Sequence, residues 1–368
     1  SIRPQDDFFH YANGGWLLNT QIPPEEARWG SFYVLRFETE ERLKKVFEDL
    51  QTRDRETLIP EERSVLTLFE TASDMGTRNN LHDTPLAPWR EKISALTVRQ
   101  DLVAYFAEAS EAGISAAPWS MGVGQDDKDA EKNVLHLWQG GLGLPDRDYY
   151  LKDTAEEVRV RTEYRAHVVR LMVLAGKSPA EAERIATTVL AFETRLAKAS
   201  MTKEDARLPE KTYNKRSLEA LSEDAPAFDW KSYFERMQLP VTADITVGQP
   251  EFLAEVSSMM KDIPLEEWKD YLEFRLTNSA AGALSELFVK ENFDFYGTVL
   301  SGLKVQKPLW RRALAFTASV MDDAVGTLFA KEHFPPEAAH RMDELVNDIV
   351  EAYRVRIQAL NWMSDATK

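Results

Sequence analysis

Apolar residues recur along most of this chain at the three- and four-residue spacing that places them on one face of an α-helix. Between residues 32 and 50, Leu43, Val46, Phe47 and Leu50 share such a face, and charged residues occupy the opposite one. Similar patterns predict helices over residues 60–72, 98–112, 154–176, 178–200, 215–221, 230–237, 250–261, 265–281, 283–293, 309–331 and 336–363. The chain is therefore predicted to be mainly α, a multi-helical lobe.

Two of these helices begin with a recognisable capping signal. Thr154 and Glu157 have the spacing of a capping box, in which the first side chain and the fourth satisfy backbone N–H groups reciprocally. Ser178 and Glu181 repeat that spacing, with Pro179 at the first helical position. Both pairs predict the residue at which a helix starts.

A different pattern precedes residue 140. Two short runs rich in β-branched and aromatic residues, 119–123 and 134–138, flank the polar stretch 124–133. This arrangement predicts a β-hairpin with an acidic, solvated tip. The predicted fold class is accordingly a multi-helical lobe with a small β-hairpin element.

Residues 140–150, with the sequence GGLGLPDRDYY, join the predicted hairpin to the long helices. Three glycines in four residues allow positive φ, and Pro145 fixes its own φ, so we expect a sharp turn and a close approach of another part of the chain. The glycine spacing is not the G-x-G-x-x-G of a dinucleotide site, and no lysine and hydroxyl pair follows as in a phosphate loop. We interpret the segment as structural.

The first 31 residues are rich in glycine, proline and aromatic residues, and we predict an extended or turn-rich lead-in over 1–31. Residues 32–368 show neither a tandem repeat nor a clear linker, which predicts one helical lobe rather than separate domains.

Composition limits the functions to be considered. The formal charge of −16 repels phosphate backbones, so we expect no nucleic-acid partner. The absence of cysteine excludes disulfides, thiolate nucleophiles and cysteine-ligated zinc. No apolar run approaches the length of a membrane span, and the first ten residues do not resemble a signal peptide.

No complete active site can be read from the residues. The histidines are His10, His82, His136, His167, His333 and His340. None of them forms the H-E-x-x-H pattern that places two zinc ligands on one helical face. His333 and His340 would align on a continuous helix, but Pro335 and Pro336 interrupt it. With no G-x-S-x-G motif either, we predict no catalytic residue and no metal ligand in this chain.

Several segments, in order along the chain, resemble the neprilysin family of zinc metallopeptidases. The two most specific are DFFHYANGGWL at residues 7–17 and LGLPDRDYY at residues 142–150. Weaker matches are ETRLA at 193–197, YN at 213–214, FDW at 228–230, WRR at 310–312, DAVGTL at 323–328 and LNWM at 360–363. Together they cover essentially the whole chain.

The resemblance implies a zinc-dependent metalloendopeptidase that hydrolyses oligopeptides. It also implies that the zinc ligands, the catalytic glutamate and the segment that grips the substrate backbone belong to a C-terminal catalytic domain, beyond Lys368. This chain would then be the N-terminal, lid-forming portion, which restricts and orients substrates in a central cavity. By itself it is predicted to bind no zinc and to be inactive.

One functional residue is implied by position within the resemblance. Arg28 stands where the family has an arginine that contacts the carboxylate end of short substrates, a contact that suits the planar guanidinium. The family's supporting aspartate corresponds to Tyr33, which is a departure from the pattern. The alternative is a structural Arg28 paired with Glu25 or Glu26.

A second hypothesis is a free-standing, non-catalytic helical peptide-binding or scaffold protein derived from the same lobe. It predicts a chain with no large exposed apolar face. The lack of cysteine differs from the disulfide-bonded animal members and indicates a bacterial protein, for which the resemblance implies an extracytoplasmic or cell-surface location.

Overall fold

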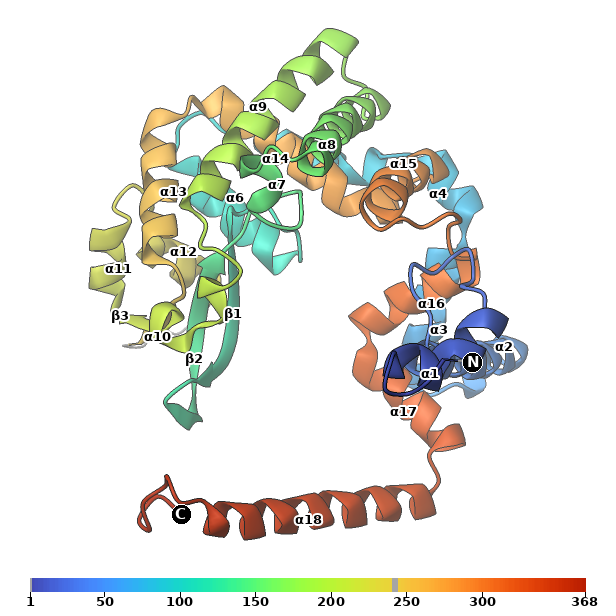
Figure 1. The fold of residues 1–368 in the computed structure, drawn as a ribbon. Coiled ribbons are helices and arrows are strands. Elements are labelled where there is room, and N and C mark those ends of the chain that lie inside the picture. Colours follow the sequence, from blue (N-terminus) through green and yellow to red (C-terminus); the bar gives the residue numbers. More distant parts are fainter. Residues whose placement is uncertain (1, 240–243) are drawn as a thin grey trace. The chain divides into compact units, whose positions relative to one another are not determined.

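The computed structural model describes residues 2–239 and 244–368 (Figure 1). The chain forms two compact units, here called unit 1 (Ser1–Asp74 with Val305–Lys368) and unit 2 (Met75–Lys304). Neither boundary coincides with the predicted division at residue 31. Unit 1 combines both ends of the chain, an arrangement that composition along the sequence does not reveal.

The described part of unit 1 is helical. Its α-helices are α1 (Phe8–Asn19), α2 (Ser31–Thr52), α3 (Pro60–Ser73), α16 (Leu309–Val320), α17 (Asp322–His333) and α18 (Pro336–Ala359). Its core lies between α2, α3, α16 and α17, where Phe47 and Phe69 pack with their ring centroids 4.6 Å apart. Burying these apolar faces is what holds the two ends of the chain together.

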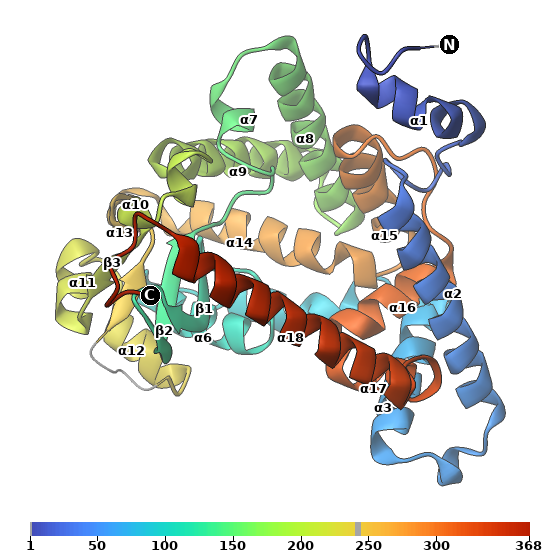
Figure 2. The same ribbon diagram turned by 60° about the horizontal axis from the view of Figure 1, so that its bottom comes forward.

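The described part of unit 2 contains more helices and all the strands. The α-helices are α4 (Met75–Leu81), α5 (Ala87–Ser94), α6 (Asp101–Glu111), α7 (Asp148–Leu151), α8 (Ala155–Leu174), α9 (Pro179–Ala199), α10 (Pro209–Thr212), α11 (Leu218–Asp224), α12 (Trp230–Arg236), α13 (Pro250–Asp262), α14 (Leu265–Ala280) and α15 (Glu286–Asn292), and a π-helix follows at Phe293–Leu300. Figure 2 shows α8, α9 and α14 of this unit. Their buried faces contribute to one large core, which includes the stacked rings of Phe192 and Tyr271.

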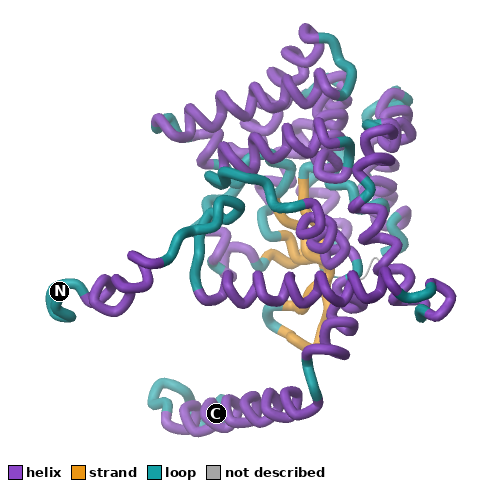
Figure 3. Tube along the Cα trace, turned by 90° about the vertical axis from the view of Figure 1, so that its right-hand side faces the viewer, coloured by secondary structure: helices purple, strands orange, loops and turns teal. Residues whose placement is uncertain are grey.

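The small sheet has the strand order β1-β2-β4-β3, from β1 (Trp119–Asp126), β2 (Asp129–Gln139), β3 (Asn214–Arg216) and β4 (Ile245–Val247). β1 and β2 form the predicted antiparallel hairpin, with Trp119 opposite Gln139. β4 runs parallel to β2 and antiparallel to β3. In Figure 3 the strands are orange among purple helices. The predicted class, mainly α with a small β element, is confirmed.

Most predicted helices are present, but several predictions need correction. Residues 8–19, predicted as part of an extended or turn-rich lead-in, form helix α1, which the Asp7 side chain caps by accepting from the His10 backbone N–H. The helix predicted over 215–221 is replaced by strand β3 and then α11, which Ser217 caps. The predicted capping box at Thr154 is not formed, whereas the one at Ser178 is present.

The helix predicted over 309–331 is broken. Met321 has a non-helical backbone conformation, and α16 and α17 meet there at 112°. The Asp322 side chain accepts from the Asp323 N–H, so the second helix starts with its own acidic first turn. Similarly, α18 ends at Ala359, short of the predicted 363.

Among the described residues, no single helix is long and apolar enough to cross a membrane. The bent pair α16 and α17 meets the length and composition test only when both helices are taken together.

The glycine-rich segment 140–150 makes the predicted close approaches. Gly141 has φ +77°, and a Cβ there would lie 2.8 Å from the Pro118 Cα. Tyr271 donates its hydroxyl to the Gly141 carbonyl at 2.8 Å, and Arg275 donates to the Leu142 carbonyl at 3.2 Å. The segment is therefore fastened to α14 through its own backbone.

Beneath this segment lies a buried carboxylate. Glu193 of α9 accepts hydrogen bonds from the Tyr150 hydroxyl at 2.7 Å and the Tyr164 hydroxyl at 2.9 Å. Burial raises the pKa of Glu193 to about 7, although both tyrosine hydroxyls and the charge of Arg275 act in the opposite direction. Glu193 thus links the 140–150 segment to α8 and α9.

Candidate functional site

Arg28, the candidate substrate-binding residue, lies in the irregular segment between α1 and α2 of unit 1. Two residues earlier, Glu26 is buried and pairs with Arg36 at 2.8 Å, Arg311 at 3.0 Å and Lys307 at 3.1 Å. Burial alone would raise the pKa of Glu26, but these cations lower it below its ordinary value. Glu26 is thus an ionic anchor for the segment that carries Arg28.

The anchor reaches across unit 1 through Arg311 of α16. Its guanidinium is almost fully buried and also bonds Glu40 of α2, with Nε to Oε2 at 2.6 Å. A backbone bond from the Val305 N–H to the Pro24 carbonyl, 3.2 Å long, adds a second tie. Because a buried guanidinium without partners would be costly, these carboxylates and the segment are held in place together.

Arg28 itself is exposed and forms no hydrogen bond or ion pair with any residue that the structure describes. The structural alternative, pairing with Glu25 or Glu26, is not formed, because both carboxylates face Arg311 instead. The guanidinium is therefore available to a ligand on an anchored segment.

Tyr33, which stands where the family resemblance places an aspartate, gives Arg28 no carboxylate. Its ring lies 4.8 Å beneath the guanidinium of Arg36 and 6.4 Å from the ring of Trp29. The departure noted in the sequence therefore corresponds to a different local contact, a cation–π pair.

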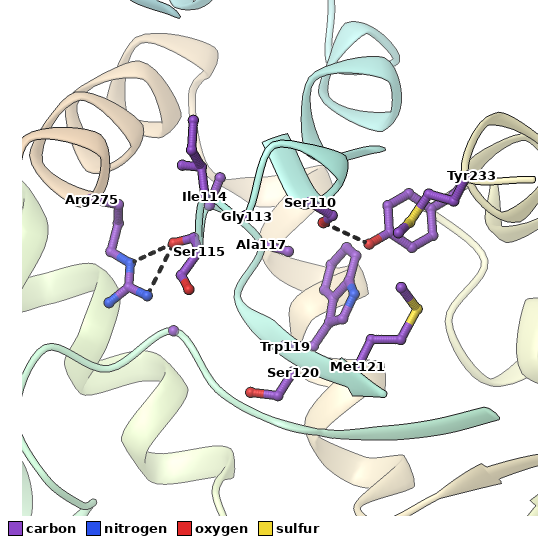
Figure 4. A pocket seen from close by; sticks show the side chains of 13 residues that line it. Ser110, Gly113, Ile114, Ser115, Ala117, Trp119, Ser120, Met121, Tyr233 and Arg275 are labelled. Atoms are coloured by element: carbon purple, nitrogen blue, oxygen red, sulfur yellow. Dashed lines mark hydrogen bonds between the residues drawn. The ribbon is translucent and has the colours of Figure 1, made fainter. Parts of the chain in front are cut away.

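Unit 2 contains a second candidate site, a pocket of about 370 Å³ where strand β1 begins. Figure 4 shows Trp119, Ser120 and Met121 on one wall, Tyr233 beside them, and Arg275 and Ser115 at the other end. No acidic residue is found among the described residues that line it. Sequence reasoning did not find this pocket, because its walls come from segments far apart in the chain.

The histidines are dispersed in the structure. His167 is fully buried, with Nδ1 2.9 Å from Glu291 and Nε2 3.0 Å from Asn278. His333 ends α17, and His340 lies on α18 near Glu344. Across residues 2–239 and 244–368, no three His, Cys, Asp or Glu side chains are grouped so that they could hold a metal ion. The donors of this part of the chain do not fit a zinc site.

Unit 1 exposes many large apolar side chains, which sequence reasoning also missed. Neither α1 nor α18 buries any residue, and the first turns of α2 are exposed as well. The most exposed are Leu18 at 89%, Phe32 at 83% and Trp362 at 74%. Helix α18 carries an exposed apolar stripe, formed by Leu345, Val346, Ile349, Val350 and Tyr353. Apolar surface of this extent marks an interaction site.

A family model described as peptidase family M13 matches residues 4–368. Among curated relatives, Neprilysin-3 of Drosophila melanogaster is 27% identical over all of this chain and 49% of its own length. Endothelin-converting enzyme 1 of Mus musculus is also 27% identical, over all of this chain and 48% of its own length.

Among solved structures, the zinc metalloprotease ZMP1 of Mycobacterium tuberculosis, in complex with an inhibitor, superposes with a TM-score of 0.90. It is 28% identical, and the match covers 100% of this chain and 55% of that protein. The chain thus spans about half the length of the relatives it matches.

Proposed function

Because this chain belongs to peptidase family M13, we propose that it is the N-terminal portion of a zinc-dependent metalloendopeptidase that hydrolyses oligopeptides. Membership confirms the neprilysin-like resemblance inferred from segments 7–17 and 142–150. The observation that carries the proposal is the match over residues 4–368 to proteins about twice as long.

The reaction itself is assigned to residues outside this chain. We propose that the zinc and the attack on the peptide bond are supplied by the half of the complete enzyme that the match to this chain leaves uncovered. We propose that this portion restricts and orients substrates in a central cavity. An extracytoplasmic or cell-surface location in a bacterium stays a prediction.

The exposed apolar side chains of unit 1 support the proposal that a separate catalytic portion completes the enzyme. A free-standing scaffold would have to keep Leu18, Phe32 and the apolar stripe of α18 in water, at a cost of about 25 cal/mol per Å² of apolar surface. We propose that the catalytic portion covers them. They favour the peptidase hypothesis over the free-standing binding protein.

The proposal makes a direct prediction about activity. The 368-residue chain, verified by intact mass, should leave a quenched oligopeptide uncleaved, because its sequence contains no H-E-x-x-H motif. The protein encoded by the complete reading frame should cleave the same peptide and lose that activity to a chelator. Chelator-sensitive cleavage by the verified chain alone would overturn the assignment.

We further propose that Arg28 binds the terminal carboxylate of a short substrate. In the complete enzyme, Arg28→Gln should raise KM about 10- to 100-fold for a substrate with a free C-terminus, the equivalent of one lost charge-assisted hydrogen bond. The KM for the C-terminal amide of the same peptide should change less than about threefold, because the amide has no terminal carboxylate for Arg28 to bind.

Arg42→Gln is the matched control for Arg28, because Arg42 is also exposed, on α2, and forms no ion pair with the described residues. It should leave both KM values unchanged. Arg28 does not bind the carboxylate if the two variants have the same KM values. The same conclusion follows if Arg28→Gln changes the KM of the acid and of the amide equally.

A further inference from the structure

We propose that the pocket at the start of β1 binds a carboxylate-bearing residue of a peptide, at a site separate from Arg28. This inference rests on the proposed function, because it adds a peptide contact in unit 2. The pocket of about 370 Å³ is lined by residues from α6, the loop before β1, β1 itself, Gly141, α12 and α14. Its volume suits one or two amino-acid residues rather than a long segment.

The charge of the pocket has one sign. Of the described residues that line it, Arg275 is the one that carries a charge, in a protein with a formal charge of −16. Its Nε and Nη2 donate to the Ser115 carbonyl at 3.3 and 3.1 Å, and its Nη1 donates to the Leu142 carbonyl. Among the described residues it forms no ion pair within salt-bridge distance, although its charge and that of the buried Glu193 act on each other. A guanidinium with only carbonyl partners favours an anionic ligand.

Neutral donors lie in the same pocket. The Trp119 indole is buried, with 5% of its surface exposed. Its Nε1 acts on the pKa of the nearby Tyr233 hydroxyl as a donor does, but it forms no hydrogen bond of full geometry with a described residue. It lies beside Tyr233, with the two ring centroids 5.8 Å apart, while the Tyr233 hydroxyl pairs with Ser110 at 3.2 Å. Since buried N–H groups favour a well-aligned acceptor, a ligand oxygen in the pocket would give the indole N–H a better bond than the Tyr233 hydroxyl does.

The remainder of the wall is apolar. Ile114, Ala117, Met121 and Met237 line it beside the polar groups. Methionines adapt to different apolar shapes. The pocket therefore combines donors for a carboxylate with a surface for an aliphatic or aromatic side chain.

The walls are fixed before any ligand arrives. Arg275 ties Ser115 to Leu142, and Tyr271 holds the Gly141 carbonyl, so two loops are fastened to α14 (Figure 4 shows the Ser115 bonds). Because little ordering is then needed on binding, even a small ligand can be held.

The test uses the ¹⁵N-labelled 368-residue chain and follows the indole N–H signal of Trp119, assigned with Trp119→Phe. Three probes are titrated: N-acetyl-Ala-Leu with a free carboxylate, its C-terminal amide, and N-acetyl-Glu-Leu-amide. The first should shift the Trp119 signal with a Kd of about 1 mM or tighter, and the plain amide should not. A shift with the third probe would identify an acidic side chain as a second source of the carboxylate.

Ser120 gives a matched pair of variants, because it is exposed at the pocket and replacing it leaves the loop ties intact. Ser120→Asp places a negative charge at the site and should weaken binding of the carboxylate probes at least about tenfold. Ser120→Asn introduces a neutral side chain of the same size as aspartate, and its Kd for the carboxylate probes should stay within about threefold of that of the parent.

The proposal fails if no carboxylate probe shifts the Trp119 signal, if the amide shifts it equally, or if the two Ser120 variants bind alike. None of these outcomes depends on peptide hydrolysis or on Arg28. Loss of the proposed peptidase function would therefore be seen separately, in the cleavage assay of the complete enzyme.

Discussion

Replacing Gly143 by alanine is expected to destabilise unit 2 by about 3–5 kcal/mol, the combined cost of overpacking and a lost buried hydrogen bond to a carboxylate. A Cβ at this position would overlap the Tyr164 hydroxyl and lie 2.7 Å from its Cζ. Tyr164 cannot yield without leaving Glu193, whose Oε2 accepts its hydroxyl at 2.9 Å. The glycine is required here by the space a tyrosine occupies.

Hydrogen exchange of α8 and α9 amides, measured by mass spectrometry, would report the loss directly. Gly282→Ala is the control, because a Cβ there meets nothing within 4 Å and Gly282 is exposed. It should change the exchange free energy by less than about 1 kcal/mol. Equal protection in the two variants would show that Tyr164 moves at little cost.

The second large effect is a pH dependence centred on Glu193. Its pKa of about 7 in the folded chain lies above the ordinary value of 4.5, so the folded state holds the proton more tightly than the unfolded state. Between pH 4.5 and 7 the unfolded chain loses this proton first, and the free energy of unfolding falls as pH rises. The loss totals about 3 kcal/mol by pH 7 and levels off about one pH unit above the folded pKa.

Glu193→Gln removes this titration. The unfolding free energy of the variant minus that of the parent should rise by about 3 kcal/mol between pH 4.5 and 7.5, measured by urea unfolding at a series of pH values. Taking the difference cancels the other titrating groups. Glu181→Gln, at the exposed capping box, should show no such rise, because the pKa of Glu181 is lowered and its contribution changes below pH 4.5. A flat difference for Glu193→Gln would contradict the raised pKa.

Local chemistry explains which parts of the fold could be predicted. Helix α9 starts at the predicted capping box because Ser178 and Glu181 satisfy each other's backbone N–H groups without help from elsewhere. The hairpin follows equally from its own alternating residues. The break at Met321 could not be predicted from local residues. Helices α16 and α17 each present apolar residues to the core of unit 1, so the helical pattern continues through the bend.

The candidate site was less accessible to sequence reasoning. Arg28 was identified by resemblance, but its anchor joins Glu26 to Arg311, 285 residues away, and no local pattern encodes that ion pair. The pocket at the start of β1 depends likewise on the hydrogen bond from Arg275 to the Ser115 carbonyl, 160 residues earlier in the chain. Contacts of such separation become visible only when the chain is folded.

Unit 1 is built from both ends of the chain, so during synthesis unit 2 can fold before unit 1 is complete. Helices α2 and α3 leave the ribosome early, but the core they share needs Ala313, Leu314, Val325 and Leu328. At translation rates of about 5–20 residues per second, Phe69 waits roughly 10–50 s for Leu314. Unit 2, continuous from Met75 to Lys304, can fold in that interval. The nascent chain therefore carries an unpaired apolar helical hairpin, a substrate for chaperones, until its partner helices emerge.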